Sequence, residues 1–330
     1  MACHAPYKLG KAAVRVEGPS DGYGLKYVVP NDAWGIQLFN GHILEYVAAS
    51  GALGFDGKAW PWERLLCWLG LIDIDSDFFT VVTKTLTRQP TEGNLRWYDP
   101  WFCVRPIRDG FVNAVGLTNP GIDWWCRKIG PSVKKEKLSL VASIFGEPEE
   151  LGEMATMLNS FELVGLEINA SCPNTKDDGF QDTERVVAAC QAVKANSSLP
   201  LILKLSVVHD VARIARQVKG LVEAFSINSV PWAVAFPDHW SPLERLGGGG
   251  VFGKTAQRLT WPMVGKIARD TNVPVIGPSV WDYDDIERLR TLGARAISFG
   301  SLFLRHPGRP TQYVMWDVRA RMAAKTNPHT

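Results

Sequence analysis

Several features that mark other classes of protein are missing from this chain of 330 residues. Its most apolar stretch, residues 65–74, is flanked by charges and is far too short to cross a bilayer. The first ten residues contain no hydrophobic signal core, so secretion is not indicated. The net charge of +2 gives no general attraction to nucleic acid or to acidic membranes. These absences predict a cytoplasmic protein that binds neither nucleic acid nor a membrane.

Cysteine is scarce and follows no recognisable pattern. None of the six cysteines forms a CxxC pair, so neither a disulfide framework nor an iron–sulfur cluster in this chain is indicated. The nucleotide-binding motifs GxGxxG and GxxxxGK[ST] are absent, as are HExxH and other clustered metal ligands. We therefore expect a reducing compartment, no metal site, and no Rossmann-type nucleotide site.

What the chain does contain is a regular alternation of short β-branched runs and helical periods. Eight runs are predicted as strands, at residues 43–48, 79–84, 140–143, 163–169, 200–204, 224–227, 273–276 and 296–299. Helices are expected between most of them. Eight strands separated by helices favour a parallel (β/α)8 TIM barrel, an α/β fold. A doubly wound open sheet is the structural alternative.

Two segments do not fit this alternation. Residues 1–40 are predicted to form an N-terminal extension. Residues 86–137 are too long for a simple crossover, so we expect an excursion over the barrel mouth, above the C-terminal face. The turn-rich residues 89–94 suggest small antiparallel strands there. The whole chain, 1–330, is expected to be a single domain.

Polar residues stand at the C-terminal ends of the predicted strands, where a parallel barrel has its active site. They occur in Thr83-Lys84-Thr85, in Asn169-Ala-Ser-Cys172-Pro-Asn174, at Lys204, in Asn228-Ser229, in Gly277-Pro-Ser279 and in Gly300-Ser301. A single lysine there is usually a solvated residue, and a single asparagine often caps a turn. Together they predict a site that fixes a flat, heteroatom-rich, anionic ligand.

Cys172 alone would more often be a buried apolar thiol than a catalyst. It stands, however, in a polar, proline-stiffened loop directly after a strand. A thiol exposed there toward a ligand can act as a base near neutral pH. A cysteine hydrolase is the rival interpretation, but it needs a histidine partner. Neither His42, before the first strand, nor His239, in a long loop, is well placed for that role.

Glycines in the last three barrel units suggest an anion cradle. Gly249 and Gly250 end a run of four glycines, Gly253 follows, and Gly277 and Gly300 close the last two strands. Backbone N–H groups in this part of a barrel, aided by a helix N-terminus, bind phosphate. For the run of four glycines alone, a flexible loop is an equally good explanation. The pattern as a whole favours a phosphate-bearing cofactor.

In their order along residues 44–307, these motifs resemble the class 1 dihydroorotate dehydrogenases. The matching motifs are Ala49-Ser-Gly51 with Gly54-Phe55, Thr83-Lys-Thr85, Asn113 to Gly121, Asn169 to Asn174, Lys204 in Leu-Lys-Leu-Ser, Asn228-Ser229, Gly249 to Gly253, and Gly300-Ser301. Each motif is weak by itself, whereas the ordered set is specific.

The resemblance implies FMN-dependent oxidation of dihydroorotate to orotate in pyrimidine biosynthesis. Cys172 would be the general base, and Lys84 a second catalytic residue beside the flavin. The implied substrate-binding residues are Asn113, Gly116, Leu117, Asn169, Asn174, Asn228 and Ser229. The implied cofactor-binding residues are Ser50, Gly51, Lys84, Asn169, Lys204, Gly249, Gly250, Gly277, Ser279, Gly300 and Ser301. This chemistry needs a base for the acidic proton and a flavin for the hydride.

The chain also departs from the family pattern. The family usually has consecutive glycines where this chain has Pro278, Ser279 and Val280, and Pro278 has no N–H to offer a phosphate. Phe252 replaces a small residue. Two alternatives therefore stay open: a related dihydropyrimidine oxidoreductase, and a catalytically altered barrel that only binds a flavin or phosphate ligand.

The resemblance also bears on partners. Residues 113–121 look closer to the NAD-linked class 1B branch, which works with an iron–sulfur flavoprotein subunit. Such a subunit is an expected partner, together with a second copy of the chain in a homodimer and the small-molecule substrate.

Overall fold

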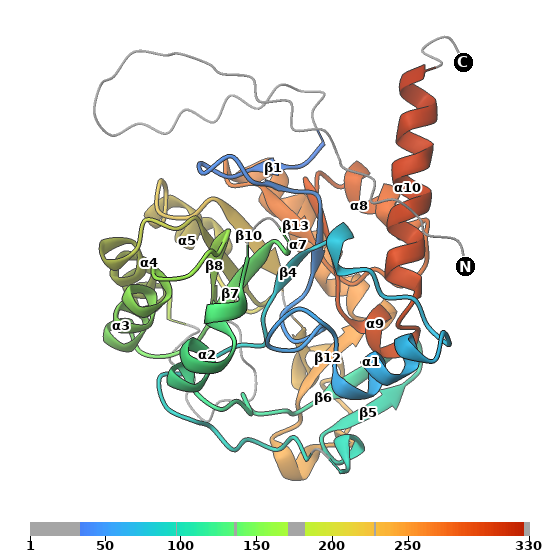
Figure 1. The fold of residues 1–330 in the computed structure, drawn as a ribbon, viewed down its shortest axis with the longest axis horizontal. Coiled ribbons are helices and arrows are strands. Elements are labelled where there is room, and N and C mark those ends of the chain that lie inside the picture. Colours follow the sequence, from blue (N-terminus) through green and yellow to red (C-terminus); the bar gives the residue numbers. More distant parts are fainter. Residues whose placement is uncertain (1–33, 97, 135–136, 171–181, 228, 327–330) are drawn as a thin grey trace.

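The computed structural model describes residues 34–96, 98–134, 137–170, 182–227 and 229–326 (Figure 1). Eight strands form a closed barrel in which every neighbouring pair is parallel. They are β3 (Tyr46–Ala48), β4 (Thr80–Val82), β7 (Leu140–Ile144), β8 (Gly165–Asn169), β9 (Leu201–Leu205), β10 (Ala224–Ile227), β13 (Val275–Gly277) and β14 (Ala296–Phe299). The predicted TIM barrel is confirmed, and the doubly wound open sheet is excluded because the sheet closes.

Helices surround this barrel and follow most of its strands (Figure 1). They are α1 (Pro61–Trp68), α2 (Ile122–Lys128), α3 (Pro148–Leu158), α4 (Thr183–Asn196), α5 (Val211–Gln217), α6 (Trp232–Ala235), α7 (Lys254–Asp270), α8 (Asp285–Thr291), α9 (Ser301–Arg305) and α10 (Arg309–Thr326). Pro262 lies inside α7, which continues through it. None of the helices in the described ranges is long and apolar enough to cross a membrane.

The N-terminal end of the barrel is packed solid. Branched side chains such as Val47, Val141 and Ile202 fill its interior, and each is almost fully buried. Leu38 and Leu44 join the same cluster from a hairpin whose strands are β1 (Ile36–Gln37) and β2 (Ile43–Leu44). Because this end is closed by apolar side chains, a ligand must enter from the carboxyl ends of the strands.

The first predicted strand, residues 43–48, was wrong in its extent. Its first two residues form β2, which pairs antiparallel with β1, and only β3 enters the barrel. Ile43 is half exposed, and the Glu45 carboxylate accepts a hydrogen bond from Arg321 at 3.1 Å. The chain thus leaves one sheet and enters another at Glu45, which an apolar run alone does not reveal.

A four-stranded antiparallel sheet stands beside the barrel mouth. Its order is β11 (Val230–Pro231), β12 (Gly250–Gly253), β6 (Gly110–Asn113) and β5 (Val104–Ile107). The segment 86–137 therefore supplies antiparallel strands, as predicted, but not at residues 89–94, where the structure has only an isolated bridge from Thr91 to Asn119. Asn113 pairs with Gly250 in this sheet. The sheet therefore brings together two segments predicted to belong to the site, those of Asn113 and Gly250.

The organisation of residues 1–330 as a single domain stays a prediction.

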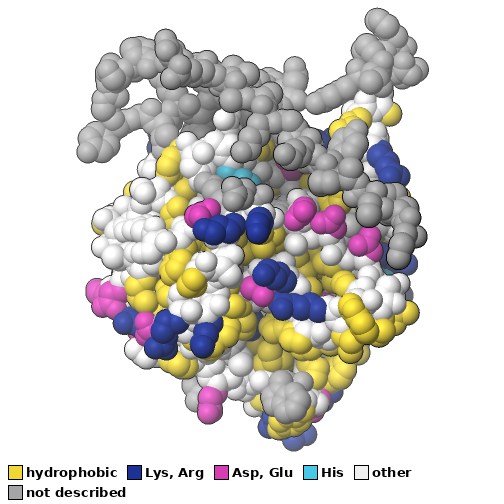
Figure 2. All heavy atoms as spheres, viewed as in Figure 1, with side chains coloured by type: hydrophobic (Ala, Val, Ile, Leu, Met, Phe, Trp, Pro, Cys, Tyr) yellow, Lys and Arg dark blue, Asp and Glu magenta, His cyan; other side chains and the backbone are white. Residues whose placement is uncertain are grey.

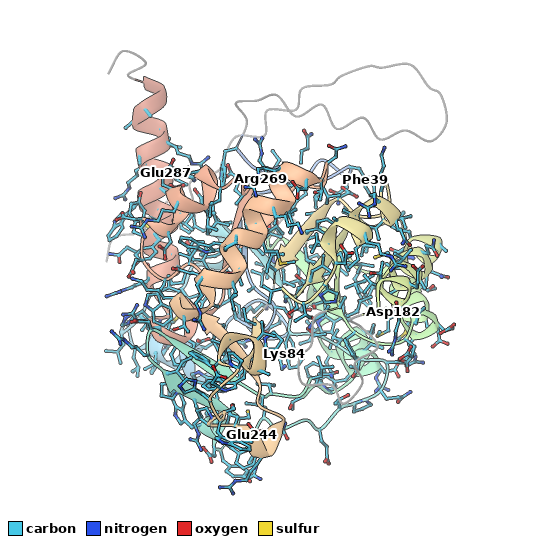
Figure 3. The ribbon with its side chains drawn as sticks, turned by 180° about the vertical axis from the view of Figure 1, so that it is seen from behind. Phe39, Lys84, Asp182, Glu244, Arg269 and Glu287 are labelled. Atoms are coloured by element: carbon cyan, nitrogen blue, oxygen red, sulfur yellow. The ribbon has the colours of Figure 1, made fainter. Side chains whose placement is uncertain are left out.

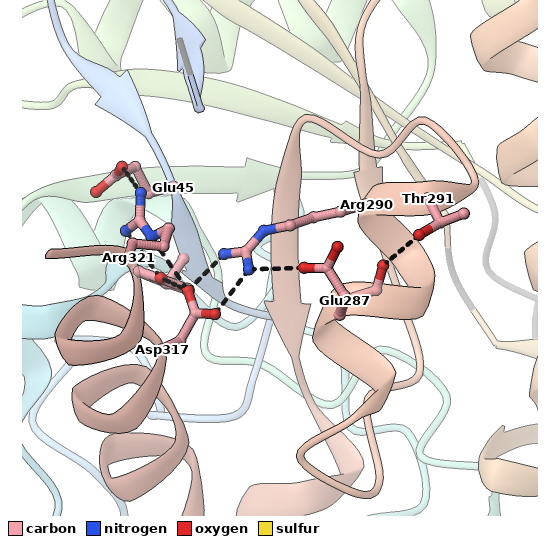
Figure 4. Close-up of polar contacts among 7 residues, drawn as sticks. Glu45, Glu287, Arg290, Thr291, Asp317 and Arg321 are labelled. Carbon is pink, nitrogen blue, oxygen red and sulfur yellow. Dashed lines mark hydrogen bonds and ion pairs between the residues drawn. The ribbon is translucent and has the colours of Figure 1, made fainter. Parts of the chain in front are cut away.

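A buried ionic cluster fastens the last helix, α10, to the barrel (Figure 4). The Asp317 carboxylate, only 4% exposed, accepts hydrogen bonds from the Tyr46 hydroxyl and from both terminal nitrogens of Arg290. Arg321 lies 3.3 Å from the same carboxylate. Burial alone would raise the pKa of Asp317, but hydrogen bonds from Arg290 and Tyr46 more than offset this, so the pKa is lowered.

We expect Asp317→Asn to cost about 3 kcal/mol of unfolding free energy at pH 7, because it leaves buried arginines without their counter-charge. A carboxylate whose folded-state pKa is lowered stabilises the fold above its unfolded pKa of about 3.9, and this contribution is lost as the pH falls through the folded value. Urea unfolding of both proteins should therefore converge at acid pH. Glu287→Gln, which alters an exposed partner of Arg290, is the control and should change stability by less than about 0.5 kcal/mol. A difference independent of pH would contradict this account.

Candidate functional site

A cavity of about 360 Å³ opens at the carboxyl ends of the barrel strands. Cofactor and ligand sites typically measure roughly 300–1,000 Å³. Lys84, two residues after the end of β4, is partly buried, lines this cavity and lies near the middle of the view in Figure 3. The predicted site residues that line the cavity are Ser50, Gly51, Lys84, Asn113, Gly116, Leu117, Asn169, Lys204, Ser229, Ser279, Gly300 and Ser301. The structure therefore brings together residues that are far apart in the sequence.

A chain of hydrogen bonds crosses the floor of this cavity. It runs from Ser50 to Thr85 at 3.1 Å, to Ser143 at 3.0 Å, to Glu167 at 3.1 Å and to Lys204 at 3.0 Å. The Asn169 amide joins it by donating to the Thr85 hydroxyl at 3.0 Å. These side chains come from neighbouring strands, so strand pairing fixes their spacing. Connected buried networks of this kind hold their side chains rigidly.

Glu167 is the main residue that the sequence analysis missed. It lines the cavity, and its carboxylate pairs with Lys204 while both side chains are more than nine-tenths buried. Lys204 also stands beside Asn169 in the β8–β9 register. The sequence did hold a sign of this role, because a charged residue two positions before Asn169 in a strand projects to the same face.

The start of α1 forms an aromatic wall of the cavity. Trp60 and Trp62 stack with ring centroids 5.3 Å apart, and the Trp60 indole N–H donates to the Gly51 carbonyl at 3.1 Å. Gly51 has a φ of +82°, which suits glycine, so Trp60 fixes a backbone turn beside Lys84. Glu63 also lines the cavity, and burial raises the pKa of its carboxyl. These three residues were also absent from the predicted site.

Two non-glycine residues in the cavity wall have left-handed backbones. Leu117 has a φ of +60° and Ser279 a φ of +67°. Such conformations cost of order 1–3 kcal/mol and tend to gather at functional sites. Nearby, Gly116 has a φ of +67° and lies against Asn94, whose amide donates to the Ala114 carbonyl at 2.8 Å.

Some predicted residues lie elsewhere. Gly249 and Gly250 face the antiparallel sheet, where a Cβ on Gly249 would come within 2.4 Å of the Asn113 carbonyl. Gly277 packs toward Leu289, behind the barrel wall. Cys172, Asn174 and Asn228 lie outside the described residues. The roles of all six stay predictions.

The cysteine-hydrolase alternative receives no support from the described histidines, since none of them lines the cavity. The His42 ring pairs with the Thr80 hydroxyl at 2.7 Å, at the start of β4 and so at the opposite end of the barrel. His239 contributes its backbone carbonyl to the Trp232 indole N–H.

Hydrophobic side chains gather on the surface near the cavity entrance, over α1 and β5 (Figure 2). On α1, Trp62 and Leu65 are about half exposed and Trp68 is 80% exposed. Trp101, just before β5, is also about half exposed. An apolar area of this kind is typical of a surface that binds another protein.

Comparison with known proteins agrees with this geometry. The family model for dihydroorotate dehydrogenase matches residues 67–304. The chain belongs to the dihydroorotate dehydrogenase family. Similar members are the catalytic subunits of dihydroorotate dehydrogenase B (NAD(+)) from Caldicellulosiruptor saccharolyticus, 30% identical over 79% of this chain and 84% of the relative, and from Caldicellulosiruptor bescii, 30% identical over 83% and 87%. The corresponding Bacteroides fragilis subunit is 28% identical over 67% of this chain and 74% of its own length. The predicted family and its oxidoreductase class are confirmed.

The buried pair in this dihydroorotate dehydrogenase-like cavity can be tested by a double-mutant cycle. Glu167→Gln leaves the Lys204 charge without its partner, so we expect a loss of about 3–5 kcal/mol in unfolding free energy. Lys204→Met in the same chain should recover part of that loss, because both charges are then gone. Urea unfolding of the four proteins measures the coupling.

The exposed pair of Glu184 and Arg213 is the matched control. Glu184→Gln should cost less than about 1 kcal/mol, because solvent screens that pair. Equal losses at the two sites, or additive losses in the cycle, would show that the pair at Glu167 is not coupled.

Proposed function

We propose that this chain oxidises dihydroorotate to orotate in pyrimidine biosynthesis, with FMN bound in the cavity. The observation that carries the proposal is the convergence of Lys84, Asn169 and Lys204 in one buried polar site of a barrel that belongs to this family. Lys84 offers a positive charge to an anionic ligand, whereas the charge of Lys204 is paired with Glu167. The Asn169 amide offers both a donor and an acceptor to a ring edge.

The described residues fit FMN. The cavity is large enough for a cofactor, and it runs from the polar floor to the ends of the last two barrel strands. Lys204, Lys84, Gly51 and Ser50 would hold the ring, while Ser279, Gly300 and Ser301 would hold the phosphate. When bound, FMN supplies the hydride acceptor that oxidation of a C–C bond requires.

The substrate would lie between the barrel and the antiparallel sheet. Asn113, Gly116 and Leu117 line the cavity from the sheet side, whereas Asn169 and Ser229 line it from the barrel side. In this proposal Asn174 and Asn228 add further amides. Two sides that offer amide donors and acceptors would orient a flat pyrimidine ring and exclude water.

Cys172 is the proposed general base. Ala170, two residues earlier, is fixed by a hydrogen bond from its N–H to the Lys204 carbonyl at 3.1 Å. Two residues of chain extend at most about 7 Å, so this proposal keeps the thiol within reach of the cavity mouth. There it would take the proton from the carbon beside the substrate carbonyl, while the neighbouring carbon loses the hydride and the single bond between them becomes a double bond.

We further propose that electrons leave through a partner protein. The similar relatives are named as catalytic subunits of an NAD(+) enzyme, which favours an iron–sulfur flavoprotein subunit as the acceptor for this chain too. The exposed apolar surface over α1 lies beside the cavity and supports docking there. Assembly as a homodimer and a cytoplasmic location stay predictions.

The proposal predicts that dihydroorotate bleaches the flavin absorbance of the FMN-loaded protein under anaerobic conditions. Cys172→Ser should retain the flavin but be reduced roughly 10²–10⁴-fold more slowly at neutral pH, because the hydroxyl is a far weaker base. Stopped-flow absorbance measures both rates. Cys126→Ser, a change in helix α2, is the control and should react like the wild type.

Each alternative gives a different result in this experiment. Bleaching by dihydrouracil but not by dihydroorotate would favour the related dihydropyrimidine oxidoreductase. A bound flavin that neither compound reduces would favour the catalytically altered barrel. Equal rates for wild type and Cys172→Ser would remove Cys172 from the mechanism.

A further inference from the structure

The side chain of Gln257, on helix α7, is hydrogen-bonded to the loop that follows β13. The Gln257 amide nitrogen donates two hydrogen bonds, to the Ser279 carbonyl at 2.9 Å and to the Asp285 carboxylate at 2.8 Å. Both protons of a primary amide are thereby used. Gln257 does not line the cavity, whereas Ser279 does.

The Asp285 carboxylate accepts hydrogen bonds from the backbone of the rest of this loop. It is fully buried, and the oxygen that accepts from Gln257 also accepts the backbone N–H groups of Trp281 at 2.9 Å and Asp282 at 3.0 Å. One carboxylate oxygen therefore ties α7 to the whole turn between β13 and α8. Such charge-assisted hydrogen bonds are about twice as strong as neutral ones.

Ser279, which accepts one of these hydrogen bonds, is also the residue of the loop whose backbone conformation is strained. Ser279 has a left-handed φ of +67°, which surrounding contacts must maintain because an L side chain disfavours it. Two further residues of the same α7 face assist: the Trp261 indole N–H donates to the Pro278 carbonyl at 3.2 Å, and the Thr260 hydroxyl lies 3.4 Å from that of Ser279. Positions four apart on a helix share a face, so Gln257 and Trp261 act side by side.

We propose that Gln257 is a positioning residue for the phosphate of the cofactor, an inference that rests on the proposed function. In barrels of this kind the phosphate binds at the loops after the last two strands. Pro278 cannot donate an N–H there, so Ser279 is left as the donor that this loop presents to the cavity. By holding the Ser279 carbonyl, Gln257 would keep the N–H and hydroxyl of that residue available to an anion.

The test compares two ligands that differ only in the phosphate, FMN and riboflavin. Their dissociation constants for the apoprotein are measured by quenching of flavin fluorescence. Gln257→Glu keeps the shape but replaces both donors with acceptors beside Asp285, so FMN binding should weaken at least about tenfold and riboflavin binding less than about twofold. Gln257→Leu removes the donors without adding charge and should show the same selectivity with a smaller change.

Gln217→Leu is the matched control, because it removes an exposed glutamine amide from helix α5. Trp261→Phe keeps an aromatic side chain but removes the indole N–H that donates to Pro278. It should weaken FMN binding more than riboflavin binding, and it provides a second test if the Gln257 variants do not fold. Thermal melting identifies the folded variants.

Unchanged FMN binding, or equal weakening of both ligands, would overturn the role of Gln257 and leave the proposed function in place. A wild-type protein that binds FMN no better than riboflavin would also overturn it. Failure of dihydroorotate to reduce bound flavin would instead count against the proposed function alone.

Discussion

The buried ion pair of Glu167 and Lys204 is the interaction on which the cavity depends. Neither charge could remain inside the barrel mouth without the other, because an unpaired buried charge costs several kcal/mol. Their pairing at 3.0 Å places a cationic side chain at the floor of a cavity lined mainly by apolar and neutral polar groups. Barrel closure then gives the remaining side chains, including Lys84 and Asn169, fixed positions around that charge.

The strained backbone conformations in the cavity wall are held by contacts from residues outside the cavity. Leu117 and Ser279 both line the cavity and keep left-handed backbones. For Ser279 the support is visible in the contacts from α7, and for the turn at Gly116 in the contact with Asn94. The departure from glycine near position 279 therefore need not abolish a phosphate site. In this chain, side chains on one face of α7, rather than consecutive glycines, hold the backbone of that loop in place.

The barrel could be predicted because its strands are short, largely apolar runs that are buried on both faces. Because the carboxyl ends of parallel strands meet at one mouth of a barrel, polar residues at strand ends, such as Lys84, Asn169 and Lys204, could be expected to lie together there. The antiparallel sheet could not be placed from sequence. Strand β5 contains Arg105 and Pro106, and β12 is rich in glycine, so pairing between distant segments, rather than local preference, creates these strands. Glu167 was missed because the sequence does not show that its carboxylate meets Lys204 of the neighbouring strand, although its place two residues before Asn169 predicts the shared face. Trp60 and Glu63 were missed because the sequence does not show that the start of α1 lies against the cavity.

The central claim is that these residues surround one planar redox ring and one pyrimidine. A crystal structure of the FMN-loaded protein with orotate tests it most directly. The account predicts a flavin between Lys84 and Lys204, with orotate stacked on it within hydrogen-bond distance of Asn113 and Asn169. A flavin bound outside the barrel mouth, or orotate bound away from these asparagines, would contradict it.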